Sequence, residues 1–337
     1  MKKLSMLFGL LLVVLVIAAC GAGNSEEEAS GEEADESTEE NTADEGTEEE
    51  SNNEETEAEE VTIEHELGET TVEKNPENVV VFDFGSLDTL DTLGVDVAGV
   101  PQANIPTYLE QYESSDYENV GGLKEPDFEK IAAMNPGLIV ISGRQSDAYE
   151  ELSEIGPTIY TAVDTQDYWN SFESNVNKLA SIFEKEDEAE EELASIQEDV
   201  DALKEEASSL DEEALIVLAN DGQLSAYGSG SRFGILHDEF GFPEADENIE
   251  ASTHGQSVSF EYVTEEDPDY LFVIDRGAVV GGDSSAQEVI ENELTETTSA
   301  YENDNIVYLN PNYWYLSGGG LQSVAEMANE AESAIAE

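Results

Sequence analysis

Three arginines have the residue type and the neighbours expected of an anion-binding site. The 337-residue chain carries 81 aspartates and glutamates against 11 lysines and arginines, a net charge of −70. Only Arg144, Arg232 and Arg276 are arginines, and they lie in "ISGRQS", "GSGSRFG" and "IDRGAVV", beside glycine or serine. A guanidinium group is a planar fork of donors that binds carboxylate or phenolate oxygens and stacks on aromatic rings. The three together predict a site for an anionic ligand.

A competing interpretation pairs each arginine with a nearby carboxylate, which in a chain this acidic remains open for any single arginine. The shared position of all three at glycine-rich junctions, with none on a predicted helix face, favours a common anion cleft. Arg232 also lies where a Gly/Ser turn leads into a predicted helix over residues 232–242, and backbone N–H groups of that turn are expected to face an anion.

Two aromatic and histidine motifs are expected near this cleft. "STHGQS" places His254 in a polar loop, and "NPNYWYLSGGG" places Tyr313, Trp314 and Tyr315 before three glycines. Trp314 and Tyr315 are predicted ligand contacts, with core packing as the alternative for at least one aromatic. His254 and a tyrosinate are candidate Fe(III) ligands, since imidazole and hard oxygen both suit that ion. The alternative for His254 is an ordinary surface histidine.

An internal repeat indicates the elements that position the arginines. Residues 128–144, "FEKIAAMNPGLIVISGR", and 260–276, "FEYVTEEDPDYLFVIDR", both open on Phe-Glu, with Pro eight and Arg sixteen positions after Phe. Each predicts a short helix, a buried strand and an arginine at its carboxyl end, where ligands bind in open α/β sheets. We therefore expect two similar α/β lobes, residues 61–166 and 211–337, with the ligand in the cleft between them.

The segment 167–210 between the lobes is predicted to be one linking helix. Apolar residues recur at helical period without Gly or Pro, and about 35 to 40 helical residues would extend over about 50 Å. A bundle or coiled coil is the alternative, but no other segment offers an evident partner helix. Further strands are predicted in 78–84, 213–221, 223–228 and 305–311, and further helices in 86–95 and 321–336.

The N-terminus predicts export and a lipid anchor. Residues 1–20 have two lysines, an apolar run and "IAAC", which is typical of a secretory signal ending in a lipobox, with Cys20 as the lipidated residue. Residues 21–60 hold 19 acids and no basic residue, which predicts a disordered tether. We expect a location on the outer face of the cell membrane of a Gram-positive bacterium.

The acidity excludes nucleic acid as a partner. Of the 81 acids, 62 remain in residues 61–337 against nine lysines and arginines, a charge of about −53. Nucleic-acid binding needs a basic surface. An acidic surface is tolerable in brine, because at about 1 M salt the screening length falls to about 3 Å. The composition favours a halophilic source.

Taken together, these motifs resemble the siderophore-binding lipoproteins of iron ABC importers. The similarity covers nearly all of residues 61–337 and is closest to the ferric-catecholate subgroup that includes the petrobactin-binding proteins. The segments in which this similarity is found are "GGLKEPDFEKIAAMNPGLIVISGRQS", "GSGSRFGILHDEFGF", "STHGQSVSFEY", "DRGAVVGGDSSA" and "NPNYWYLSGGGLQS".

The resemblance implies roles for individual residues. Arg144, Arg232 and Arg276 would meet an anionic Fe(III)-siderophore, with His254 and Tyr315 completing iron coordination in some complexes. Glu129 and Glu261, the twin glutamates of the repeat, would dock each lobe onto arginines of the permease. The implied partners are the siderophore, the ABC permease with its ATPase, and the membrane through Cys20. We expect a monomer, no permanent cofactor and no enzymatic activity.

Four other functions agree less well with the sequence. Cobalamin or haem binding on the same fold would need fewer arginines. Direct Zn²⁺ or Mn²⁺ capture wants several histidines and carboxylates in one site, and the only histidines are His65, His237 and His254. A hydrolase is disfavoured because neither a Gly-x-Ser-x-Gly nor a His-Glu-x-x-His motif occurs. A purely structural surface protein would have no reason to bury three arginines.

Overall fold

The computed structural model describes residues 59–282 and 284–336, which belong to one compact unit of residues 56–337. The predicted signal peptide, Cys20 and nearly all of the predicted tether lie outside the described residues. Within the described part of the chain, no helix is both long and apolar enough to cross a lipid bilayer.

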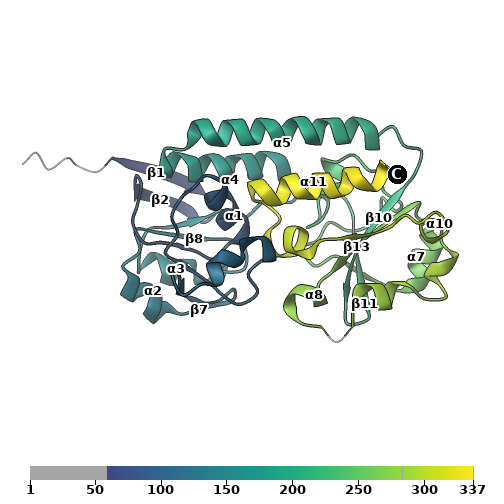
Figure 1. Ribbon diagram of the computed structural model, residues 1–337, viewed down its shortest axis with the longest axis horizontal. Helices are drawn as coiled ribbons and strands as arrows, with labels where there is room; N and C mark the ends of the chain where they lie inside the picture. The colour runs from purple at the N-terminus through teal and green to yellow at the C-terminus, as the bar shows by residue number, and fades with distance from the viewer. Residues whose placement is uncertain (1–58, 283, 337) are drawn as a thin grey trace, which may run out of the picture. The chain divides into compact units, whose positions relative to one another are not determined.

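The N-terminal lobe is built on a five-stranded parallel sheet of order β5-β4-β3-β8-β9, with two short antiparallel hairpins, β1–β2 and β6–β7 (Figure 1). Its central strands β3 and β8 are continuous apolar runs because both faces of the sheet are covered there, and all of their residues are buried. The elements are β1 (Glu60–His65), β2 (Gly68–Glu73), β3 (Val79–Val81), α1 (Phe84–Thr92), β4 (Gly99–Val100), η1 (Thr107–Glu113), β5 (Glu118–Asn119), β6 (Gly121–Gly122), β7 (Glu125–Pro126), α2 (Phe128–Met134), β8 (Leu138–Ile141), η2 (Ser146–Ala148), α3 (Tyr149–Ser153) and β9 (Thr158–Tyr160).

The C-terminal lobe has a mixed five-stranded sheet of order β12-β11-β10-β13-β14. Strands β10, β13 and β14 are parallel, whereas β11 and β12 are added antiparallel at one edge. The elements are β10 (Ala214–Asn220), β11 (Gln223–Tyr227), α6 (Ile235–Asp238), β12 (Gln256–Val258), α7 (Phe260–Glu266), β13 (Tyr270–Asp275), α8 (Gly277–Val280), α9 (Ala286–Ile290), η3 (Thr295–Thr297), α10 (Ser299–Glu302), β14 (Ile306–Leu309), η4 (Asn312–Ser317) and α11 (Leu321–Ile335). The predicted α/β class with two lobes is confirmed.

The sequence repeat corresponds to a repeated piece of structure. Helices α2 and α7 and strands β8 and β13 begin at equivalent positions of the two copies, and each strand is fourth in its sheet order. Both helices end on a left-handed residue, Asn135 with φ 50° and Asp267 with φ 44°. Asn and Asp tolerate this conformation better than other L-residues. The repeat therefore places Arg144 and Arg276 just after equivalent strands.

The prediction of a single uninterrupted linking helix is wrong. The segment forms two helices, α4 (Tyr168–Phe183) and α5 (Glu186–Ala207), separated at Glu184, whose φ is 54°. The break is fixed from outside the segment: Asn75 donates a hydrogen bond to Glu184 at 2.8 Å, and Lys74 forms an ion pair with it at 3.5 Å. Only α5 remains to span the lobes, about 33 Å at 1.5 Å per residue.

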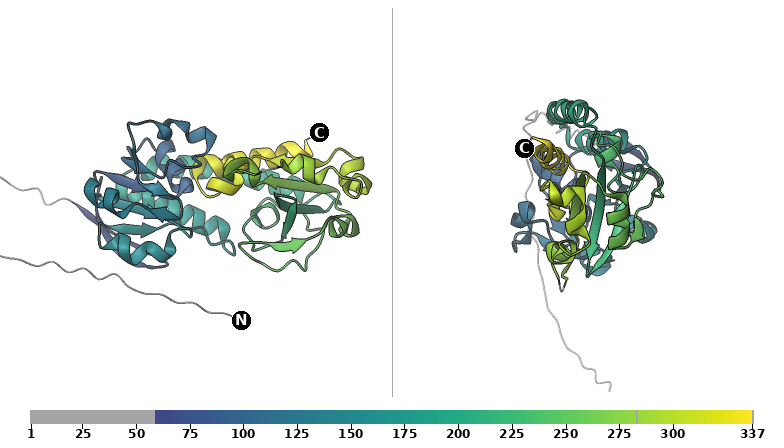
Figure 2. Two further views of the ribbon diagram at one scale, coloured as in Figure 1. Left: turned by 90° about the horizontal axis from the view of Figure 1, so that it is seen from below. Right: turned by 90° about the vertical axis from the view of Figure 1, so that its right-hand side faces the viewer.

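Helix α5 also has the partner helices that the sequence did not suggest. It packs against α4 and against α11, and α1 of the N-terminal lobe packs against α4 and α11 (Figure 1). Figure 2 shows α11 beside the strands of the C-terminal lobe, where it contacts β14. Buried residues of α4, α5 and α11 share one hydrophobic cluster with the C-terminal sheet. The lobes are thus joined by a packed helical layer.

Candidate functional site

A cavity of about 730 Å³ lies between the lobes and collects most of the predicted site residues. Arg144, Arg232, Arg276, His254 and Tyr315 all line it. The other lining residues are Asp83, Lys124, Ser142, Gly143, Tyr160, Thr161, Ala162, Val163, Thr165, Tyr168, Thr253, Ser317, Gly318 and Gly319. Arg144 and Arg276, which lie 132 positions apart in the two copies of the repeat, therefore line the same cavity.

Tyr315 is the residue on which the three arginines converge. Arg144 donates from Nη2 to the Tyr315 carbonyl at 3.0 Å, and Arg232 donates from Nη2 to the same oxygen at 2.6 Å. Arg276 donates from Nε to the Tyr315 hydroxyl at 2.8 Å. One residue thus receives hydrogen bonds from an arginine of the N-terminal lobe and two of the C-terminal lobe.

The Tyr315 ring also lies against two of these cations. The guanidinium carbon of Arg232 is 4.4 Å from the ring centroid, and that of Arg276 is 5.7 Å away, both within cation–π range. Burial by itself raises the pKa of Tyr315, but the hydrogen bond from Arg276 and the charges of all three arginines outweigh it. The net result is a pKa below that of an ordinary tyrosine, so the site favours negative oxygen.

Within the described residues, the arginines are not neutralised by carboxylates. The ion pairs there all use lysines: Lys74, Lys130, Lys185 and Lys204. Arg276 also donates a hydrogen bond from Nη1 to the Asn220 side-chain oxygen at 2.8 Å. Burial, and then the nearby charge of Arg144, lower the pKa of Arg232. Mutually repelling cations bonded only to neutral oxygens suit a site that accepts an anion.

The turn that carries Tyr315 is anchored in both lobes. η4 is a π-helical turn, a rare conformation that is frequent at functional sites. Trp314 enters the hydrophobic cluster of the C-terminal lobe, whereas Leu316 enters that of the N-terminal lobe. Tyr315 lies between them in the sequence and faces the cavity. Its position therefore depends on both cores at once.

Trp314 is not a ligand contact, and its prediction is corrected. Its side chain is 2% exposed, packs edge-on against Phe240, and donates its indole N–H to Glu330 at 2.9 Å. Tyr313 also turns away from the cavity lining and packs on Tyr108 at 4.7 Å between ring centroids. Trp314 thus packs in the core, as the alternative for at least one of these aromatics stated, and Tyr313 is partly buried against the same cluster.

The turn before Arg232 differs from expectation in two ways. The helix predicted over 232–242 is limited to α6, a single turn. The N–H groups of Ser229 and Gly230 are occupied by internal carboxylates, Glu244 and Asp238, each at 2.7 Å. The turn therefore presents the Arg232 side chain to the cavity and directs these two backbone donors into the protein.

His254 lines the cavity on a loop that a tyrosine holds in place. The loop is held by Tyr227, which donates its hydroxyl to the His254 carbonyl at 3.1 Å. Among the residues that the structure describes, no three His, Cys, Asp or Glu side chains gather as a metal-binding group. Iron at this site would have to arrive with most of its ligands already bound.

Two charged cavity residues were missed by the sequence reasoning. Lys124, exposed in the β6–β7 turn, has no ion-pair partner among the described residues, and its neighbour Leu123 accepts a hydrogen bond from Gln145. The only signal was its place in the glycine-flanked "GGLKEP". Asp83 is directed to Ser142 and to the N-terminus of α1, at 2.7 Å and 2.8 Å, which satisfies its carboxylate.

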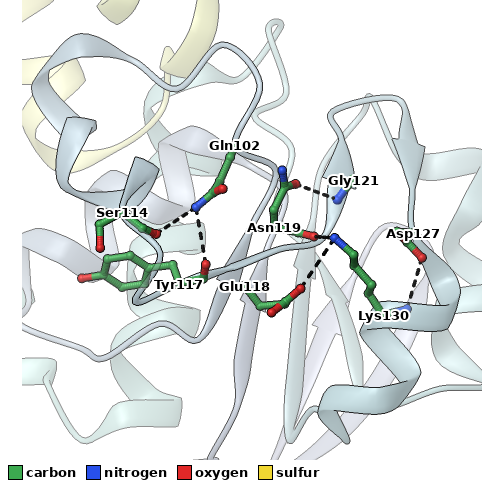
Figure 3. Close-up of polar contacts among 8 residues, drawn as sticks. All are labelled: Gln102, Ser114, Tyr117, Glu118, Asn119, Gly121, Asp127 and Lys130. Carbon is green, nitrogen blue, oxygen red and sulfur yellow. Dashed lines mark hydrogen bonds and ion pairs between the residues drawn. The ribbon is translucent and has the colours of Figure 1, made fainter.

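Glu129 and Glu261 occupy equivalent, exposed positions in the first turns of α2 and α7. Figure 3 shows how the start of α2 is held: Asp127 accepts from the Lys130 N–H at 3.2 Å, and the Lys130 ammonium donates to the Asn119 carbonyl at 2.8 Å. The same picture shows, to the left of this region, Gln102 bonded to the carbonyls of Ser114 and Tyr117. Glu129 therefore projects from a well-fixed helix start.

Comparison with known proteins gives consistent matches. The family model described as periplasmic binding protein matches residues 79–313. The petrobactin-binding protein YclQ of Bacillus subtilis (strain 168) is 45% identical over 337 residues, which is 99% of each chain. Its crystal structure aligns with a TM-score of 0.81 and 49% identity, covering 83% of this chain and 99% of that one. The catecholate-siderophore binding protein VctP from Vibrio cholerae aligns at 0.78 and 36%, covering 82% and 100%.

Proposed function

This chain is a member of the periplasmic binding protein family, and we propose that it binds an anionic ferric siderophore and delivers it to an ABC permease. The family consists of substrate-binding components of transporters, so the protein is not an enzyme. YclQ is named for petrobactin and VctP for catecholate siderophores. This favours a catecholate or mixed citrate–catecholate ligand, petrobactin-like in charge and donor type, over cobalamin or haem.

The observation that carries the proposal is the convergence of three arginines in one cleft without a described carboxylate partner. A deprotonated catecholate complex offers negative phenolate oxygens and aromatic faces, and guanidinium groups bind both. His254 and Tyr315 line the same cavity, where they would complete the coordination of iron held by a ligand with too few donors. The transported complex is cargo, and no resident cofactor is needed.

An intrinsic-fluorescence titration tests this function. Both tryptophans adjoin cavity-lining residues, Trp169 next to Tyr168 and Trp314 next to Tyr315, so a bound coloured iron complex should quench them. Residues 56–337 carry the described hydrophobic clusters and serve as the titrated unit, in molar salt. We expect saturable quenching by ferric catecholate and citrate–catecholate complexes, and none by ferric hydroxamates. Quenching by hydroxamates alone would remove the arginine–catecholate mechanism.

Arginine variants separate the mechanism from general charge effects. Each Arg→Ala change at 144, 232 or 276 should weaken binding by about 1.5–3 kcal/mol, the scale of a hydrogen bond to a charged group. Lys185→Ala is the control, because it removes one positive charge at a residue whose ion pair within the described part of the chain is with Glu188 on α5. Unchanged affinity in all three arginine variants would contradict the mechanism.

We also propose that the protein is anchored through Cys20 as a monomer and docks through Glu129 and Glu261. Cys20→Ala should release the protein from cells and abolish incorporation of labelled fatty acid. Glu129→Gln and Glu261→Gln should lower siderophore-dependent iron uptake while leaving ligand affinity unchanged. Glu265→Gln, at another exposed position of α7, is the matched control. Equal uptake in all three glutamate variants would refute the docking role.

A further inference from the structure

A buried carboxylate outside the cavity lining connects the two lobes. Asp88 on α1 is 1% exposed, yet it accepts three hydrogen bonds from other segments. Oδ1 accepts the Gln322 N–H at 2.8 Å, and Oδ2 accepts the Ser323 N–H at 2.7 Å. These are free N–H groups in the first turn of α11, where a carboxylate is also favoured by the helix dipole. Asp88 thus caps α11 from the opposite lobe, where Figure 1 shows α1 beside α11.

The third hydrogen bond leads toward the ligand turn. The Tyr108 hydroxyl lies 3.0 Å from Asp88 Oδ2 and 2.6 Å from Ser317 Oγ, and Ser317 is both the last residue of η4 and part of the cavity lining. The Tyr108 ring in turn packs on Tyr313 of the same turn. Asp88 therefore contacts the segment after the turn directly, and the turn itself through one tyrosine.

The backbone between η4 and α11 approaches α1 closely. Gly318, with φ 51°, is the C-cap residue that follows η4, and Gly320 is the N-cap residue that precedes α11. A Cβ on Gly320 would lie 2.4 Å from the Asp88 Cγ and 2.4 Å from the Gly85 carbonyl oxygen. The chain from Tyr315 to α11 is therefore pressed against α1, and moving the carboxylate must move the glycine segment that lines the cavity.

We propose that Asp88 is a positioning residue for the anion site: through α11 and Tyr108 it sets the place of the Tyr315 turn relative to the N-terminal lobe. Arg144 reaches the Tyr315 carbonyl only if that turn lies correctly against the N-terminal lobe, because Arg144 and Asp88 belong to one lobe and Arg232 and Arg276 to the other. The identity of the ligand rests on the proposed function, but the positioning role does not.

Asp91 offers a matched control on the same helix. It lies one turn from Asp88 and likewise accepts a hydrogen bond from a tyrosine hydroxyl, that of Tyr112 at 2.8 Å, but its described bonds stay within the N-terminal lobe. The variants are Asp88→Asn and Tyr108→Phe, compared with Asp91→Asn and Tyr112→Phe. Tyr108→Phe keeps the ring on Tyr313 and removes only the hydroxyl, so it tests the path if Asp88→Asn fails to fold.

Two readouts on residues 56–337 test the proposal. The first needs no ligand: the alkaline titration of Tyr315, taken as the difference between each protein and its Tyr315→Phe derivative. Asp88→Asn and Tyr108→Phe should move this titration back toward that of an ordinary tyrosine, and the Asp91 and Tyr112 variants should not. The second is affinity for a ferric catecholate complex, which should fall about fivefold to tenfold in the first pair and less than about twofold in the second.

The outcomes separate this inference from the proposed function. If the wild type binds no siderophore but the Tyr315 titration shifts as described, the function fails and the positioning role stands. If Asp88→Asn and Tyr108→Phe fold and leave both readouts unchanged, the positioning role is wrong. Equal losses in the Asp88 and Asp91 pairs would likewise overturn it, because they would reflect general destabilisation of α1.

Discussion

Arg276 and Tyr315 form the one side-chain hydrogen bond that links an arginine of the cleft to its central tyrosine, at 2.8 Å between Nε and the hydroxyl oxygen. Among the described residues, the hydrogen bonds from Arg144 and Arg232 reach this tyrosine only at its backbone carbonyl, although the Arg232 guanidinium also lies 4.4 Å from the centroid of its ring. The hydroxyl is therefore controlled chiefly by Arg276, which gives the site an observable that does not depend on any ligand.

Tyr315 should ionise at lower pH than an ordinary tyrosine. Burial raises its pKa. The hydrogen bond from Arg276 and the charges of the arginines together lower the pKa by more than burial raises it, so the net shift is downward. Ultraviolet tyrosinate absorbance, taken as wild type minus Tyr315→Phe, measures this. Arg276→Gln should move the transition to clearly higher pH, and Arg144→Gln should move it less, because among the three arginine charges that of Arg144 lowers the pKa least. A larger effect from Arg144 would show that the hydrogen bond is not decisive.

Lys124 should act as a fourth cation of the cleft. It lines the cavity without a described ion-pair partner, in a turn held against the Arg144 loop by Gln145. Lys124→Gln should weaken binding of an anionic ferric complex by about 1 kcal/mol, near fivefold, which is the scale of a partly exposed ion pair. Lys185→Gln removes the same charge elsewhere and should have no effect. Equal affinities of the two variants would exclude Lys124 from the site.

Asp88 should make stability depend on pH in a specific window. Burial raises its pKa to about 6, although hydrogen bonds from Ser323, Gln322 and Tyr108 oppose the shift. The folded state then binds a proton more tightly than the unfolded chain, so this contribution is fully present below about pH 4 and is lost as the pH rises through 6. The other titratable groups that sense its charge, Tyr108, Tyr168 and Tyr313, stay neutral throughout this window.

Denaturant unfolding in molar salt at several pH values measures this dependence. Subtracting the profile of Asp88→Asn removes the contribution of the many surface carboxylates. The difference should change by about 2.4 kcal/mol between pH 4 and pH 7, since one pKa unit corresponds to about 1.4 kcal/mol and the unfolded carboxyl is already partly ionised at pH 4. A flat difference profile would mean that Asp88 has the same pKa in the folded and unfolded states.

Association with an anionic ligand should become faster as salt is added. Attractive steering normally slows with ionic strength, but residues 61–337 carry a charge of about −53, which repels an anion at long range. The screening length falls from about 10 Å at 0.1 M to about 3 Å at 1 M, which removes the repulsion more effectively than the short contacts with the arginines. Stopped-flow quenching gives the rate, and a decrease with salt would show that the cleft field dominates.

The sequence was sufficient to place Arg144 and Arg276, because their pattern was repeated. Two copies of a helix, a strand and an arginine predicted equivalent places for Arg144 and Arg276, and the left-handed ends at Asn135 and Asp267 follow the same register. A cleft between α/β lobes followed from where strands of parallel sheets end. These inferences succeeded because local spacing determines them.

The errors arose where distant contacts decide the conformation. Nothing in the apolar spacing of residues 167–210 marks Glu184, since its left-handed conformation is supported by Lys74 and Asn75 from the N-terminal lobe. Trp314 and Tyr315 are neighbours in the sequence, and only the packing of the π-helical turn sends one into the core and the other into the cleft. Lys124 carried no periodic signal at all.

The Tyr315 carbonyl accepts hydrogen bonds from arginines of both lobes, so it competes with a ligand oxygen for the same N–H donors. An incoming oxygen that takes the Nη2 donors of Arg144 and Arg232 must replace the amide oxygen that they now hold. An oxygen that accepts no better than an amide gains little from the exchange, whereas a phenolate or carboxylate gains a charge-assisted bond. For these donors, competition with the carbonyl therefore favours a ligand with anionic oxygens over a neutral chelate of similar size.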